Sequence, residues 1–404
     1  MEYLYVEPYV HINCKEDFSL FYNTLSKDYA IIETVGVFDF VVELAKNRSA
    51  VICDRFDRKN MGEIVKLLQS KHMGGTFEIK KGDNFPIIFN NSSKIKHNID
   101  AYRKFEKNIS EKSFDFLREI SFFINNKCRY HSDINYAGYK QNLIPVHSMA
   151  EYNELGIERI EEILNKIKRA NLTQINILGG SIFDYSQFHK LNEILRTTAF
   201  RISYYINFDD FIKEETQNQL SKYNLDNIVV ILDAATFICQ SELNRFFKRN
   251  ITYSIYIQNE EHFEIVKWLK TIDSKLFLHI YPYYNGKNET FFQSNVFSNP
   301  NDYLERGISS RQIDKNKLLN MIAFGKLYIM YDEAIYTNLN HEKIYNSFDL
   351  NKIIEKEFFL NKSWLRIRKD VEPCNVCVYN AICPPISNYE YVLNRFDLCE
   401  RELK

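Results

Sequence analysis

The sequence lacks long hydrophobic runs and an excess of either charge. No run of about 18 uncharged apolar residues occurs, which argues against a transmembrane helix. Residues 1–7 also lack the basic region and apolar stretch of a signal peptide, so we expect a cytoplasmic protein without a membrane partner. Lys plus Arg number 52 against 53 Asp plus Glu, a net charge of -1, and this balance argues against a nucleic-acid partner.

Glycine and proline are also scarce, with 12 and 8 in 404 residues, which excludes collagen-like and low-complexity sequence. The hydrophobic content of 45% and aromatic content of 15% are sufficient for a buried core. At about 100 to 200 residues per domain, the length predicts two or three domains.

Several familiar catalytic motifs are missing. There is no H-E-x-x-H pair, no C-x-x-C-H, no phosphate-binding G-x-x-x-x-G-K loop and no G-x-S-x-G elbow. His131 and His147 are the histidines expected near a ligand site, and we interpret each as solvated or buried in the core rather than as a ligand. The motifs therefore do not predict a zincin, a c-type haem protein or a hydrolase.

The first 95 residues have the pattern of a small α+β domain. Apolar and polar residues alternate in short runs over residues 1–33, which predicts antiparallel strands. Helical spacing then begins at Val37 and again at Asn60, and we expect a turn at Gly74-Gly75.

From about residue 118 the pattern predicts a parallel sheet. Most of its apolar runs precede an amphipathic helix, and from residue 175 they begin 23 to 27 residues apart, the length of one strand-helix unit. Six units suggest an open or partial barrel, with a long loop after the first strand where a ligand site is expected. The runs are 120–124, 175–178, 202–206, 228–232, 251–257 and 276–280.

Half of the eight cysteines lie near the carboxyl terminus, in the pattern C-x2-C-x5-C-x15-C formed by Cys374, Cys377, Cys383 and Cys399. Four thiolates suit either zinc or an iron-sulfur cluster, and the spacing does not choose between them. The other cysteines are widely separated, as is typical of small buried hydrophobes.

The segments around these cysteines resemble the SPASM region of peptide-modifying radical SAM maturases. The likeness lies in residues 364–368, in Pro373 to Cys377, and in Cys383 through Glu390 to Cys399. Ser387 stands where that family has a further cysteine for a first auxiliary cluster. The resemblance therefore implies one 4Fe-4S cluster held by Cys374, Cys377, Cys383 and Cys399, with zinc as the alternative.

The strand-helix region resembles a radical SAM partial barrel that has lost its cofactor residues. The family's C-x3-C-x2-C motif, read from Cys128, gives Ser132 and Asn135. The family's Gly-Gly-Glu after the second strand is here Gly179-Gly180-Ser181, without the carboxylate. The resemblance implies a degenerate domain from which we expect neither S-adenosylmethionine binding nor catalysis.

The combination looks like the pseudo-radical SAM proteins of the Gly-Gly peptide systems of Bacteroidales. It implies an α/β fold with a winged-helix-like domain at 1–95, a degenerate (βα)6 radical-SAM-like partial barrel at 96–310 and a SPASM-like domain at 311–404. It also implies a non-catalytic accessory protein that binds a ribosomally made precursor peptide beside a catalytic radical SAM partner. The alternatives are an iron-sulfur oxidoreductase, a radical SAM-like enzyme with a non-standard site, or a zinc-stapled structural protein.

The first domain resembles the winged-helix element that binds leader peptides of ribosomally made natural products. Such binding adds an extended peptide to a sheet edge, with pockets beside a helix for its side chains. We expect the edge at Phe18, Leu20 and Tyr22 and the facing helix at Val65, Leu68 and Gln69, although any one of these residues is more typical of the core of the domain. The aromatic run at 281–284 could line a peptide channel or pack against the carboxyl-terminal segment.

Overall fold

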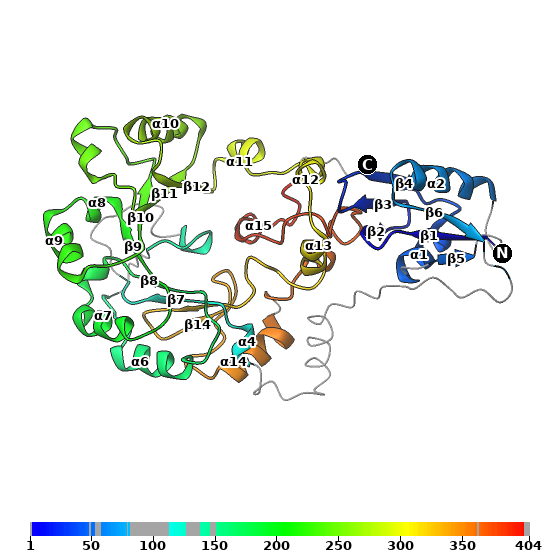
Figure 1. Ribbon diagram of the computed structural model, residues 1–404. Coiled ribbons are helices and arrows are strands. Elements are labelled where there is room, and N and C mark those ends of the chain that lie inside the picture. The colour runs from blue at the N-terminus through cyan, green and yellow to red at the C-terminus, as the bar shows by residue number, and fades with distance from the viewer. Residues whose placement is uncertain are drawn as a thin grey trace.

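The structure is a computed structural model that describes residues 2–47, 50–52, 58–78, 80, 113–126, 138–145, 151–361 and 363–399. Its largest feature is a mixed α/β region built on one eight-stranded sheet, and the amino-terminal elements form two smaller sheets (Figure 1). The carboxyl-terminal segment with α15 lies between the large sheet and the amino-terminal elements (Figure 1).

The amino-terminal elements follow the predicted order of strands and then helices. Alternating apolar residues form the strands, and one face of each helix packs on them, so that Leu4, Phe21, Phe40 and Leu68 share one core. The sheets are antiparallel, with the orders β5-β1-β6 and β2-β3-β4. The elements are β1 (Glu2–Val6), β2 (Val10–Cys14), β3 (Phe18–Asn23), β4 (Tyr29–Glu33), α1 (Phe38–Asn47), β5 (Ala50–Ile52), α2 (Arg58–Ser70) and β6 (Gly74–Glu78).

The prediction of a turn at Gly74-Gly75 is wrong, because both glycines belong to β6 and pair with β1. A Cβ on Gly74 would lie 2.2 Å from the carbonyl oxygen of Tyr5. The glycine therefore permits a close approach of two strands rather than a turn.

All six predicted strands of the central region form, and they pair in parallel in chain order. The sheet continues with β13, which pairs in parallel with β7, and ends with β14 in a hairpin with β13. These strands are β7 (Glu119–Phe123), β8 (Gln174–Leu178), β9 (Ile202–Asn207), β10 (Ile228–Asp233), β11 (Thr252–Ile257), β12 (Phe277–Pro282), β13 (Lys326–Ile329) and β14 (Ile335–Tyr336).

Helices cover the outer face of this sheet, as Figure 1 shows for α6, α7, α9 and α10. They are amphipathic: α6, for example, buries Ile157, Ile160, Ile163 and Leu164. The α-helices are α4 (Ser113–Phe116), α6 (Ile157–Lys166), α7 (Phe188–Arg196), α8 (Phe208–Phe211), α9 (Glu214–Tyr223), α10 (Phe263–Ile272), α11 (Glu289–Asn295), α12 (Pro300–Arg306), α13 (Ser310–Asn316), α14 (Leu350–Lys356) and α15 (Asn388–Leu393).

Short helices of other types connect these elements. They include the π-helix η7 (Glu357–Asn361) and the 3-10 helices η3 (Gly138–Lys140), η4 (Ile182–Asp184), η5 (Ser241–Phe246), η6 (Glu260–His262) and η8 (Arg368–Asp370). Within the described ranges, every helix is too short or too polar to cross a bilayer.

Candidate functional site

The carboxyl-terminal cysteines gather in one region of turns between η8 and the end of the described chain. All four thiols are half-buried and none forms a disulfide. Burial raises the pKa of Cys383 to about 12; Arg368 opposes this shift, and Cys377, Cys374 and Cys399 add to it. Cys383 is therefore close enough to the other three thiols to interact with them electrostatically.

The sulfur atoms do not converge on one point, however. In the described part of the chain, no three His, Cys, Asp or Glu side chains lie close enough to form a finished metal site. The Cys374 thiol donates instead to the carbonyl oxygen of Phe396, at 3.2 Å. The chemistry of these residues still suits a 4Fe-4S cluster or zinc, because four soft thiols lie near one another and a cation lies beside them.

That cation is Arg368, whose buried guanidinium ties the cysteine region together. It donates to the carbonyl oxygens of Pro384 and Phe396, each at 2.8 Å, and forms a bidentate ion pair with the carboxylate of Glu390. One of its nitrogens lies 3.9 Å from the Cys374 sulfur. Arg368 thus joins the segments before and after Cys383. Burial raises the pKa of Cys374 to about 11, and Arg368 opposes this shift.

Three residues of the predicted degenerate site, Cys128, Ser132 and Asn135, lie outside the described residues. The glycine turn after β8 is described, and the side chain of Asn125, two residues after β7, occupies it. Asn125 Oδ1 accepts from the Gly180 N–H at 2.5 Å, and Asn125 Nδ2 donates to the Ser181 carbonyl oxygen at 3.0 Å. A Cβ on Gly179 would lie 2.6 Å from Asn125 Oδ1, so the turn needs glycine for this contact.

Ser181 is buried, and its hydroxyl has no hydrogen-bond partner among the described residues. The chain therefore satisfies the backbone of this turn from within and offers no carboxylate there. Asn125 was not predicted as a site residue, although its position just after the first parallel strand is where polar ligand-binding residues are expected.

The predicted peptide-binding residues are dispersed over two cores and the surface. β3 lies between β2 and β4, so the prediction that Phe18, Leu20 and Tyr22 form an edge is wrong. Leu68 is fully buried in the amino-terminal core, with Val65 packed against it, and Gln69 is exposed.

Leu20 and Tyr22 pack instead against the cysteine region. Both are fully buried in a cluster that contains Val378 and Ile382, and Cys377 and Cys383 pack against it. The Tyr22 hydroxyl accepts from the Ile308 N–H at 2.9 Å. The alternating apolar residues of β3 that suggested a peptide-binding face therefore pack against another part of the same chain. The local sequence looks the same in both cases.

No protein-family model matches the chain, and no curated protein does. Among solved structures, it is similar to SuiB of Streptococcus suis bound to the precursor peptide SuiA, with 13% identity and a TM-score of 0.48 over 98% of this chain and 100% of that chain. It is also similar to anSMEcpe with bound AdoMet, with 15% identity and a TM-score of 0.43 over 66% of this chain and 87% of that chain. We assign the mixed α/β fold with a large parallel sheet from the strand pairing alone.

Proposed function

We propose that the protein is a non-catalytic accessory protein of peptide maturation, which binds a ribosomally made precursor peptide beside a catalytic radical SAM partner. The observation that carries the peptide-binding part is the edge of β4. Among the described strands β4 pairs with β3 alone, so one side of its backbone has no strand partner.

Exposed apolar side chains lie along this edge strand. Ile31 in the middle of β4 is 39% exposed; Leu25, in the turn before β4, and Val35, two residues after it, are 72% and 79% exposed. An unpaired strand edge with apolar side chains suits an extended peptide, because main-chain pairing supplies affinity and the side chains supply selectivity. Phe18, 38% exposed and paired with Glu33 of β4, would contribute to the same face.

The non-catalytic part of the proposal rests on the glycine turn. Asn125 already bonds the backbone of this turn, and Ser181 supplies no carboxylate for a bound amine. The sequence between the described segments also carries Ser132 and Asn135 where cysteines would be needed.

We further propose that Cys374, Cys377, Cys383 and Cys399 hold one 4Fe-4S cluster, with zinc as the alternative. A cluster supplies one-electron redox chemistry when bound. The chain's own contribution is structural: Arg368 would hold the Cys374 and Cys383 segments together, and Leu20 and Tyr22 would pack the amino-terminal sheet onto this region.

A binding experiment tests the peptide-reading role. Peptides are selected from a phage-displayed library of random 12-residue sequences against the full chain, and their affinities are measured by fluorescence anisotropy. We expect Ile31→Asp to weaken binding tenfold or more, because the charge lies where the peptide would bury apolar surface. Ile238→Asp, at an exposed isoleucine elsewhere, is the matched control and should bind like the wild type. Equal affinities for both variants would contradict the proposal.

Two further measurements test the metal and the absence of catalysis. Iron, zinc and sulfide are measured per chain after anaerobic purification, for the wild type and for Cys377→Ala. We expect about four iron and four sulfide, largely lost in the variant, whereas about one zinc without sulfide would identify a structural site. Formation of 5'-deoxyadenosine from S-adenosylmethionine and reductant, above background, would overturn the non-catalytic role and favour the enzyme alternatives.

A further inference from the structure

The inner side of the large sheet encloses a cavity of about 450 Å³. Side chains from β8 through β12 and from β13 line it, and because β12 and β13 lie far apart in the strand order, the sheet curves around the space. The volume lies in the range of small-ligand pockets.

The cavity exists because the inward positions near the start of these strands carry small or polar side chains, namely Gln174, Ser203, Thr252 and Ser254. A barrel that serves only as a scaffold fills such positions with branched aliphatic residues, which pack and need no hydrogen-bond partners. Residues 138–145 close the other end: Ile144 is buried against Tyr256 and Tyr283, and the amide of Gln141 exchanges two hydrogen bonds with the backbone of Tyr284, at 2.8 and 2.9 Å.

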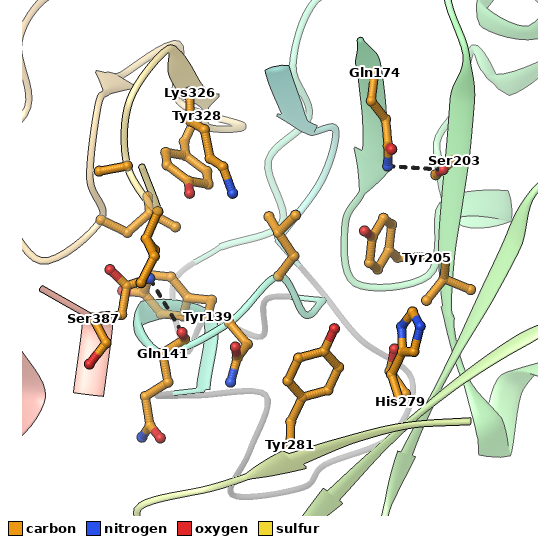
Figure 2. A pocket seen from close by; sticks show the side chains of 18 of the residues that line it. Tyr139, Gln141, Gln174, Ser203, Tyr205, His279, Tyr281, Lys326, Tyr328 and Ser387 are labelled. Atoms are coloured by element: carbon orange, nitrogen blue, oxygen red, sulfur yellow. Dashed lines mark hydrogen bonds between the residues drawn. The ribbon is translucent and has the colours of Figure 1, made fainter. Parts of the chain in front are cut away.

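Five tyrosines are among the residues that line this cavity: Tyr139, Tyr205, Tyr256, Tyr281 and Tyr328. Figure 2 shows Tyr205, Tyr281 and Tyr328 pointing into it. None of the five hydroxyls has a hydrogen bond to another described residue, although Tyr256 is only 2% exposed. A buried tyrosine hydroxyl normally has a partner, so these hydroxyls face a space that a ligand would fill.

The hydroxyls are neighbours, and they are donors. Burial raises the pKa of Tyr256 well above 10, with further contributions from Tyr281, Tyr389 and Tyr205, and burial likewise raises the pKa of Tyr328. The hydroxyls therefore stay protonated at neutral pH. The rings of Tyr256 and Tyr281 stack at 5.3 Å and form one wall of the space.

The charge of the cavity is positive. Lys326 and Arg201 line it, and none of the described residues that line it is Asp or Glu. Glu119 lies beside it and pairs with Lys326 at 3.4 Å, so the three groups together leave one positive charge. One net positive charge matches one carboxylate rather than the two charges of a phosphate ester.

We propose that this cavity binds a carboxylate-bearing ligand, anchored by the Lys326 ammonium and the hydroxyls of Tyr205 and Tyr281. The carboxylate belongs either to a free small acid or to an acidic residue of a peptide. The site is separate from the β4 edge, so its failure and the failure of the peptide-reading role are distinguishable.

Calorimetric titration of the full chain tests this with paired probes at millimolar concentration. N-acetylalanine and N-acetylalaninamide represent free ligands; acetyl-Ala-Ala-Ala-Glu-amide and its Gln counterpart represent a peptide. We expect the carboxylate member of a pair to bind at least about tenfold more tightly than its amide, because hydrogen bonds to a charged acceptor are the stronger ones. The pair with the larger difference identifies the source.

Variants then locate the site. Tyr205→Phe and Tyr281→Phe keep the ring and should each weaken the carboxylate probe about tenfold, and Lys326→Met by more. Tyr185→Phe is the matched control, because its buried hydroxyl donates to the Leu155 carbonyl oxygen at 2.7 Å outside the cavity lining. Binding of neither acid, equal binding of acid and amide, or equal affinities of the Tyr281 and Tyr185 variants would each overturn the proposal. Ile31→Asp should leave this binding unchanged.

Discussion

Replacing Arg368 by Met should destabilise the carboxyl-terminal region strongly, because it leaves a buried carboxylate without its partner. The side chain of Arg368 is 11% exposed and that of Glu390 only 1%. The substitution removes the bidentate pair with Glu390 and the hydrogen bonds to Pro384 and Phe396. Burial already raises the pKa of Glu390, and Arg368 opposes that rise, so the carboxylate depends on the guanidinium.

Breaking a buried ion pair by removing one partner costs about 3–5 kcal/mol. At about 2 °C per kcal/mol for a large domain, the unfolding midpoint should fall by about 6 to 10 °C. Lys267→Met, which removes an exposed pair with Glu264, is the control and should change the midpoint little. The assay is thermal unfolding followed by circular dichroism, on protein stripped of metal by a chelator so that metal loss does not contribute.

The double variant Arg368→Met/Glu390→Gln identifies the cause. It removes the uncompensated charge but keeps an acceptor for the backbone N–H of Ser387, which Glu390 Oε2 now accepts at 2.7 Å. It should therefore recover most of the lost stability. The reasoning is refuted if Arg368→Met behaves like Lys267→Met, or if the double variant is as unstable as the single one.

Three other changes should have measurable effects that follow from a single contact or from the burial of one side chain. Gly74→Ala would place a carbon 2.2 Å from the Tyr5 carbonyl oxygen, so we expect it to lower the stability of the amino-terminal sheet, measurable by hydrogen exchange of β1 and β6. Asn125→Ala leaves the buried Gly180 N–H without its acceptor and should cost about 1–3 kcal/mol in denaturant unfolding; a neutral result would mean that water replaces the amide. Burial lowers the pKa of His341 from 6.5, so the unfolded chain binds its proton more readily; the free energy of unfolding should fall as pH drops below about 6.5, and His341→Gln should remove that part of the slope.

The parallel strands were predictable because a strand that is buried on both faces appears in the sequence as a continuous apolar run. Each of the six apolar runs became a strand of the large sheet, since β-branched residues at that density are stable only where helices cover one face and other side chains the second. The approach of Cys374 and Cys377 was likewise predictable, because a tight turn keeps a C-x2-C pair together; that the four cysteines hold one metal group stays a prediction.

Predictions about pairing partners were less successful. Gly74 was expected in a turn but allows β6 to approach β1, and β3 was expected at an edge but is central. Alternating apolar residues indicate that a strand has one apolar and one polar face. They do not indicate which strands flank it or what covers each face. Leu20 and Tyr22 therefore looked the same whether they bound a peptide or the cysteine region.

The sequence by itself determined the order of strands and helices and the spacing of the carboxyl-terminal cysteines, because each depends on consecutive or nearly consecutive positions. Only the tertiary structure decided that Asn125 closes the glycine turn, that Arg368 joins segments around the cysteines, and that five tyrosines line one cavity. These groups come from different strands and loops, and their hydrogen bonds depend on distances that no local pattern of residues records.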